Sequence, residues 1–316
     1  MRGRVVRVDR GTVEVSVPDA VFAVDGGRHT LLVGDWVDVT TDGSPAVLRV
    51  HPRATVVSRA SADRSSSEQA LAANVDVVVV VEPLEPAPSL GRIERLLALA
   101  WSSGATPLVV LTKHDLRTMT DEDVDAVRSA APGVEVLPVS AHTGAGMAEL
   151  VEHLGAGRSF VLLGPSGAGK STLVNALAGD PHMATAAVRG DGRGRHTTTH
   201  RELVELASGS VLIDTPGLRA VGLVGDLDAI DDVFAEIGDL AEKCRFRDCA
   251  HQGEPDCAVA SAVATGDLPQ RRLDSWRKLQ REAAYQARRS DARLDREERA
   301  RMRSQGRSRR AIQSRP

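Results

Sequence analysis

Cysteines and long apolar runs are scarce in this chain of 316 residues, and each shortage argues against a class of protein. Only three cysteines are present, so they cannot all pair as disulfides, and nothing else in the chain suggests a secreted, disulfide-rich domain. No stretch of about 18 apolar residues occurs, so a membrane-spanning helix is not expected. The N-terminal segment also lacks the apolar run of a signal peptide. We therefore expect a cytoplasmic protein without membrane partners.

Aromatic residues make up 3% of the chain, so its cores must be built from aliphatic side chains, mainly Val, Leu and Ala. The formal net charge of −3 argues against a surface that is basic all round, although charge can still be segregated. The length is sufficient for two or three domains.

The N-terminal region, residues 1–60, contains short alternating strands separated by turns. Such strands at a spacing of roughly 8–12 residues predict a small closed barrel of the OB type. A structural role and RNA contact are both compatible with this barrel, because a fold alone does not assign a function. Residues 61–74 begin with a serine-rich polar segment and are expected to form a linker.

Residues 75–227 alternate strand and helix patterns, which predicts a parallel sheet covered on both faces. Residues 228–290 are helical and charged, with one long amphipathic helix over 269–290. Residues 291–316 form a basic tail that is expected to be disordered. The expected fold is therefore multidomain: an N-terminal OB-type β-barrel, a central α/β domain and a C-terminal helical region.

The strongest motif is a phosphate-binding loop between a predicted strand and a predicted helix, and it fits G-x-x-x-x-G-K-[ST] at every fixed position. Glycines let successive N–H groups point at phosphate oxygens, and the helix N-terminus adds positive potential. Lys170 is expected at the β- and γ-phosphates, and the Ser171 hydroxyl at Mg²⁺. A chance glycine-rich turn is the alternative. The nucleotide-binding residues predicted here are Gly164, Pro165, Ser166, Gly167, Ala168, Gly169, Lys170, Ser171 and Thr172.

A second motif has the pattern D-x-x-G, runs from Asp214 to Gly217 and follows a buried strand. Asp214 is expected to hold Mg²⁺ through a water molecule, and the Gly217 N–H to contact the γ-phosphate. Three threonines lie between the two motifs, and either Thr198 or Thr199 is expected to complete the Mg²⁺ shell. A solvated turn is the alternative for this threonine segment.

Two segments before the phosphate loop are suited to reading a guanine base. Asp115, in Thr112-Lys113-His114-Asp115, can accept hydrogen bonds from guanine N1–H and N2–H₂, groups that adenine lacks. The Lys113 stem is expected along the base, and a backbone N–H of Ser140-Ala141 at guanine O6. Thr112 stands where Asn is usual and has no carboxamide, which puts the anchoring of its loop in question. These segments follow the phosphate loop in an ordinary GTPase, so their order here predicts a circular permutation.

All three cysteines lie with a histidine in one window of fourteen residues, in the spacing Cys244-x4-Cys249-x-His251-x5-Cys257. Three thiolates and one imidazole satisfy a tetrahedral Zn²⁺ ion. A complete set of four ligands leaves no open position, so one structural zinc ion is predicted rather than a catalytic one. Buried inert cysteines with an incidental histidine are the alternative.

With these motifs, the chain resembles the circularly permuted GTPases that depend on the small ribosomal subunit, the RsgA group, also called YjeQ or EngC. The resemblance covers nearly the full length. It implies an N-terminal OB-type β-barrel, a central α/β P-loop GTPase domain with circularly permuted motif order, and a C-terminal helical zinc-binding domain. It implies binding to the small (30S) subunit and its rRNA during late assembly, with hydrolysis of GTP to GDP stimulated by the subunit. A monomer is expected. The segments that carry the resemblance are 33–37 (VGDWV), 73–76 (ANVD), 194–199 (GRHTTT), 214–217 (DTPG) and 244–251 (CRFRDCAH).

Catalysis of GTP hydrolysis needs charge neutralisation, for which Lys170 is a candidate, and a positioned water. Many GTPases place Gln just after the D-x-x-G turn, but here the residue is Leu218, which cannot orient water. His196 is the candidate for that role, with a structural or RNA-contacting role equally compatible. Two other functions are considered: a P-loop ATPase or kinase acting on a small substrate, and an RNA-binding scaffold with a structural nucleotide.

Overall fold

The structure of the chain is a computed structural model that describes residues 1–9, 12–40, 43–60, 68–117, 119–178, 201–214 and 227–290. Several residues with predicted roles lie outside these ranges. They are His196, Thr198, Thr199, Gly217, Leu218 and the basic tail 291–316.

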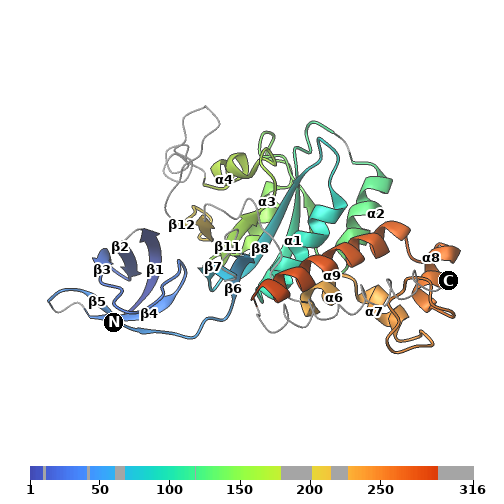
Figure 1. Ribbon diagram of the computed structural model, residues 1–316. Helices are drawn as coiled ribbons and strands as arrows, with labels where there is room; N and C mark the ends of the chain where they lie inside the picture. The colour runs from blue at the N-terminus through green and yellow to red at the C-terminus, as the bar shows by residue number, and fades with distance from the viewer. Residues whose placement is uncertain are drawn as a thin grey trace.

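The N-terminal barrel is built from five antiparallel strands, β1 to β5, drawn in blue in Figure 1. Strand alternation buries valines such as Val5, Val15 and Val37 inside it. A bridge between Asp25 and Ala46 joins the end of β3 to β5 and closes the ring. The strands are β1 (Arg2–Asp9), β2 (Thr12–Val17), β3 (Ala20–Val24), β4 (Trp36–Thr40) and β5 (Ala46–Val50).

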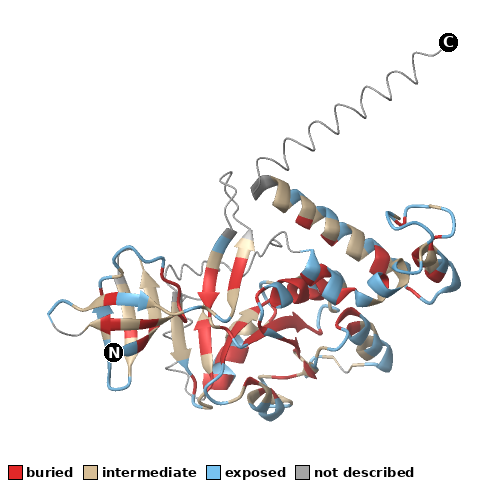
Figure 2. Ribbon diagram, turned by 90° about the horizontal axis from the view of Figure 1, so that it is seen from below, coloured by how far each residue is buried: buried red, intermediate tan, exposed pale blue. Residues whose placement is uncertain are grey.

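The central sheet has the strand order β10-β9-β8-β11-β13-β12, and neighbouring strands are parallel except for β12, which is antiparallel to β13. Every residue of β8 is buried, as expected for a parallel strand covered on both faces. Figure 2 shows the buried residues concentrated on these strands. The strands are β8 (Val77–Pro83), β9 (Thr106–Thr112), β10 (Val136–Pro138), β11 (Ser159–Leu163), β12 (Arg201–Glu205) and β13 (Val211–Asp214).

Two aliphatic clusters cover the two faces of the central sheet. The larger cluster includes Ile93 and Leu97 of α1, and the smaller includes Leu150 of α3 and Leu173 of α4. Thr120 caps α2 in a capping box with Asp123. The helices are α1 (Leu90–Ser102), α2 (Asp121–Ala130), α3 (Met147–Leu154) and α4 (Lys170–Ala178).

The barrel and the central sheet are joined by main-chain pairing. β1 runs antiparallel to β12, with Arg7 opposite Glu202 and Val8 opposite Arg201, so that one eleven-stranded sheet results. A separate two-stranded sheet forms from β6 (Val56–Ala60) and β7 (Glu68–Ala73). β7 therefore lies within the segment 61–74 predicted as a linker, and the domain boundaries stay a prediction.

The C-terminal region is helical, and its long helix α9 lies along α1 and α6 (Figure 1). The predicted helix over 269–290 is found at 270–290. Arg272, with 2% of its side chain exposed, donates to Glu94 of α1 at 2.9 Å and to the carbonyl of Val233 at 2.8 Å. No helix in the described ranges is long and apolar enough to cross a membrane. The helices are α6 (Asp228–Val233), α7 (Ala235–Ala241), α8 (Ala258–Thr265) and α9 (Gln270–Ser290).

Candidate functional site

The predicted nucleotide-binding segments gather at one edge of the central sheet. The phosphate loop follows β11, and Ser140 is the second residue after β10. Thr112 and Asp214 are the last residues of β9 and β13. Because these strands are parallel, their carboxyl ends lie at the same edge, which is where such sheets bind ligands. Motifs that are up to 102 positions apart in the sequence are therefore brought to one place.

The phosphate loop leaves β11 in a conformation that requires glycine. Gly164 has a φ of 152°, and a Cβ there would lie 2.1 Å from the carbonyl oxygen of Val81. Lys170 donates from Nζ to the carbonyls of Gly164 at 2.8 Å and of Pro165 at 2.6 Å, so its ammonium lies against the loop. α4 then begins at Lys170, and the half-buried Ser171 lies in its first turn.

The base-reading loop is bonded to the phosphate loop through Thr112. Its side chain is buried, and Oγ1 donates to the carbonyl of Ala168 at 2.5 Å. A Cβ on Gly169 would lie 3.5 Å from the same Oγ1, so a side chain at this position would meet Thr112 directly. The Thr112 hydroxyl therefore anchors the base-reading loop, although Thr112 lacks the carboxamide of the Asn that is usual at this position.

Asp115 and Ser140 come together 25 positions apart in the sequence. The Ser140 hydroxyl donates to Asp115 Oδ1 at 2.6 Å and accepts from the Thr143 N–H at 3.1 Å. The bond from Ser140 is the main reason that the pKa of Asp115 lies below its usual value, and it favours the charged carboxylate. The N–H of Ser140 donates to Ala145, which leaves the N–H of Ala141 as the candidate for guanine O6. The bond from the Ser140 side chain was not predictable from the sequence, where only a backbone role was expected for this segment.

The two middle residues of the base-reading loop are held by neighbouring segments. Lys113 has a positive φ of 62°, and its Nζ donates to the carbonyl of Glu85 at 3.2 Å. The N–H of His114 donates to the carbonyl of Val139, the residue before Ser140. These bonds fix the loop so that the exposed Asp115 lies beside Ser140.

Asp214 is half-buried at the end of β13, opposite Glu202 in the sheet register. Its strand pairs with β11, which leads into the phosphate loop. The other predicted switch residues, Thr198, Thr199 and Gly217, lie outside the described ranges.

The four predicted metal ligands form one cluster: Cys244, Cys249, His251 and Cys257 have their donor atoms within 4.8 Å of one another. Cys244 Sγ and Cys257 Sγ are 3.9 Å apart, and His251 Nδ1 is 3.6 Å and 3.4 Å from these sulfurs. A tetrahedral ion with metal–sulfur bonds of about 2.3 Å has ligand–ligand edges of about 3.8 Å. The donor set and its spacing fit a tetrahedral metal ion.

The surroundings of the cluster shift the pKa values of its ligands. Burial lowers the pKa of His251, which keeps the imidazole neutral as a metal ligand requires. Burial raises the pKa of the Cys249 thiol to about 11. For Cys244, burial is outweighed by hydrogen bonds, first from the Val259 N–H, and the pKa is lowered. The Cys257 sulfur also accepts from the Ala260 N–H at the start of α8.

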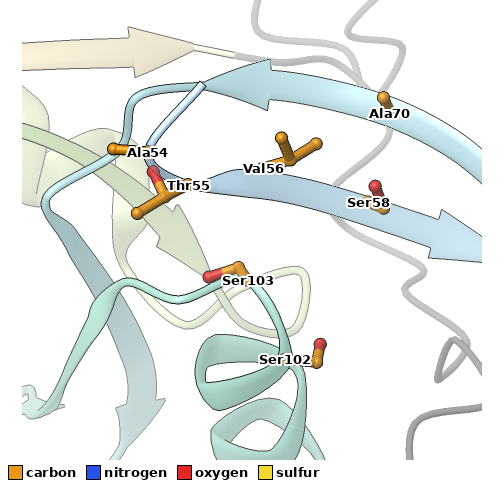
Figure 3. Close-up of a pocket in the computed structure, with 7 residues that line it drawn as sticks. All are labelled: Ala54, Thr55, Val56, Ser58, Ala70, Ser102 and Ser103. Atoms are coloured by element: carbon orange, nitrogen blue, oxygen red, sulfur yellow. The ribbon is translucent and has the colours of Figure 1, made fainter. Parts of the chain in front are cut away.

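A cavity of about 370 Å³ lies between the β6–β7 pair and the end of α1 (Figure 3). Its lining has hydroxyls but no charged group. Three of these hydroxyls already donate to backbone carbonyls: Thr55 to Val75, Ser102 to Leu99 and Ser103 to Ala100. The cavity therefore has no charged group in its lining that could hold a metal ion.

Comparison with known proteins identifies relatives over nearly the whole chain. The family model described as RsgA GTPase matches residues 50–224. The chain is 51% identical over 303 residues to the small ribosomal subunit biogenesis GTPase RsgA of Streptomyces coelicolor, covering 92% of this chain and 82% of that protein. It is 38% identical to the protein of the same name from Methanosarcina acetivorans, with 96% and 85% covered.

Solved structures agree with the observed fold. YjeQ from Thermotoga maritima matches with a TM-score of 0.66 at 28% identity, over 89% of this chain and 98% of that one. YloQ, described as a circularly permuted GTPase, matches with a TM-score of 0.63 over 89% and 94% of the two chains. At 24% identity, the second match supports the fold alone. The predicted multidomain architecture with permuted motif order is confirmed.

Proposed function

Because the chain belongs to the RsgA GTPase family, we propose that it binds the small ribosomal subunit and acts in its late assembly, hydrolysing GTP to GDP and phosphate with stimulation by the subunit. One observation carries the nucleotide part of this proposal. The buried bond from Thr112 to Ala168 joins the base-reading loop to the phosphate loop, so one ligand with a guanine and phosphates can contact both.

In this site, Asp115 accepts from the guanine N1–H and N2–H₂, and Ser140 holds its carboxylate in place. An adenine nucleotide has no matching donors, which disfavours the ATPase or kinase alternative. Lys170 and the N–H groups of the phosphate loop stabilise the negative charge that develops on the phosphates.

Mg²⁺ bound with GTP supplies further charge neutralisation at the β- and γ-phosphates. Ser171 would hold it directly, Asp214 through water, and Thr198 or Thr199 would complete the shell. His196 is our candidate for orienting the attacking water, because Leu218 has no polar atom for that task. The ribosomal subunit would complete this part of the site, which accounts for the proposed stimulation.

We also propose one structural Zn²⁺ on Cys244, Cys249, His251 and Cys257. Its role is to fix the loop between α7 and α8, where 16 residues separate the two helices. The protein would act in the cytoplasm as a monomer, with rRNA, GTP and GDP as its partners.

Hydrolysis would act as the release step, with binding to the subunit tighter in the GTP state than in the GDP state. The chain leads from Asp214 through residues 215–227 to α6, whose Val233 carbonyl accepts from Arg272. A change at the γ-phosphate could therefore reach the C-terminal helices along the chain itself.

The test is co-sedimentation with small subunits in the presence of a non-hydrolysable GTP analogue, of GDP and of no nucleotide, together with a GTPase assay with and without subunits. The analogue should give the tightest binding, and subunits should accelerate hydrolysis. Equal binding in all three states with no acceleration would favour the scaffold with a structural nucleotide. Equal competition by ATP and GTP would overturn the guanine assignment.

A further inference from the structure

A buried carboxylate lies near the carboxyl end of β8, and the nucleotide site described above does not use it. Glu82 is fully buried and lies opposite Leu111 in the register between β8 and β9. The residues of β8 that share its face of the sheet, Val78 and Val80, belong to the aliphatic core. Burying a charged carboxylate is costly unless it is paired and hydrogen-bonded, so its partners indicate what it is for.

Two residues at the start of α1 satisfy the Glu82 carboxylate. The Ser89 N–H donates to Oε1 at 2.9 Å. The Arg92 guanidinium donates to both oxygens, from Nε to Oε2 at 3.0 Å and from a terminal nitrogen to Oε1 at 2.6 Å. Ser89 directly precedes α1 and Arg92 lies in its first turn, so these bonds tie the end of β8 to the start of α1. The residues between them, 83–88, form the β8–α1 loop, whose two ends are thereby fixed.

The β8–α1 loop contacts the base-reading loop at three points. The N–H of Leu84 donates to the carbonyl of Thr112 at 2.9 Å, and the carbonyl of Leu84 accepts from Arg117 at 3.5 Å. The carbonyl of Glu85 accepts from Lys113 Nζ at 3.2 Å. The main chain of the β8–α1 loop therefore supports the base-reading loop from its first residue onward.

Lys113 is the residue through which the β8–α1 loop can influence nucleotide binding. Its stem is predicted to lie along the guanine base, so the direction of this side chain matters for affinity. A lysine side chain has several rotatable bonds, and fixing them on binding costs free energy. The bond to the Glu85 carbonyl already fixes the ammonium end, which lowers that cost.

We propose that Glu82, paired with Arg92, is a positioning residue for guanine-nucleotide binding. The pair closes the β8–α1 loop so that the Glu85 carbonyl holds the Lys113 side chain beside the base. Both residues of the pair act through Lys113 and have no contact with the nucleotide. A pair that only fixed the start of α1 would change the stability of the protein and leave its affinity for GTP unchanged. The inference rests on the proposed function, because the nucleotide that is positioned is GTP.

The test is a double-mutant cycle on the Kd for GTP, with Arg92→Ala and Lys113→Met as the two changes. Methionine keeps an unbranched stem that can pack on a base, but it has no ammonium to bond to Glu85. We expect Arg92→Ala alone to raise the Kd about two- to twelvefold, the value of one ordinary hydrogen bond. In the Lys113→Met background the same change should have almost no further effect, because the contact through which it acts is already absent.

The matched control is Arg95→Ala, which removes another ion pair of α1, formed with Glu282 of α9 at 2.6 Å. Its Kd for GTP should equal that of the unmodified protein. Glu82→Gln is a second variant that keeps the shape of the side chain and an acceptor for the Ser89 N–H. It should also raise the Kd, and it takes the place of Arg92→Ala in the cycle if that variant does not fold. Urea unfolding of every variant measures the loss of stability separately.

The outcomes separate this inference from the proposed function. If Arg92→Ala and Glu82→Gln bind GTP as the unmodified protein does, the pair has only a structural role and the inference is overturned. Equal weakening by Arg92→Ala with and without Lys113→Met, or equal weakening by Arg95→Ala, would also overturn it. Each of these results leaves the proposed function standing. If the unmodified protein binds no GTP, the proposed function fails and the inference falls with it.

Discussion

Replacing Thr112 by valine tests whether one hydroxyl holds the base-reading loop to the phosphate loop. Valine keeps the branched shape, so packing beside Gly169 is conserved while the bond to the Ala168 carbonyl is lost. Thr112 is 5% exposed, so water cannot readily replace that donor. Leaving a buried acceptor unsatisfied costs about 1–3 kcal/mol. If that cost falls on the GTP-binding geometry, the Kd for GTP should rise between about fivefold and 150-fold.

The assay is titration of a fluorescent GTP analogue, combined with urea unfolding without nucleotide. Thr112→Ser is the matched control, because it keeps the hydroxyl and removes only a methyl group, and it should bind GTP nearly as the unmodified protein does. A loss of stability without a loss of affinity would make the bond purely structural. If Thr112→Val shows neither loss, the hydroxyl does not join the two loops and the reasoning is refuted.

Three further predictions concern the base, the metal and the C-terminal helix. Asp115→Asn should weaken GTP binding and favour xanthosine triphosphate in a competition assay; unchanged GTP preference would contradict the guanine contact. Metal analysis of protein purified without chelator should give one Zn²⁺ per chain, and its removal should destabilise the C-terminal region; metal-free protein of equal stability would exclude a structural ion. Glu94→Ala removes a buried partner of Arg272, which keeps its half-exposed partner Glu236, and should cost more in urea unfolding than Glu282→Ala, in a partly exposed pair, which should cost less than about 1 kcal/mol. Equal costs would show that burial of the pair is unimportant.

The motifs were predictable because each is contiguous, and its chemistry needs particular residues at a fixed spacing. The phosphate loop and the metal ligands could both be recognised in this way. The bond between Thr112 and Ala168 spans 56 positions, and the pairing of Arg272 with Glu94 spans 178. Such contacts depend on how helices and strands pack against one another, which local sequence patterns do not predict.

The strand at the end of the segment 61–74 could not be predicted for a related reason. The segment begins with a serine-rich stretch, which indicates a linker, and its last part, Glu68–Ala73, pairs with β6. A short strand that is stabilised mainly by its partner leaves a weak signal in its own sequence.

Because β1 pairs with β12, the barrel covers what would otherwise be an open edge of the central sheet. Without β1, β12 would be an open edge with unpaired main-chain N–H and C=O groups, which is a template for association with other chains. At the opposite edge of the central sheet, β10 is only three residues long and ends in Pro138, which disfavours pairing with a strand of another chain. A fragment beginning at β6 would therefore expose the unpaired edge of β12. We expect such a fragment to self-associate unless the separate barrel is added to pair with β12.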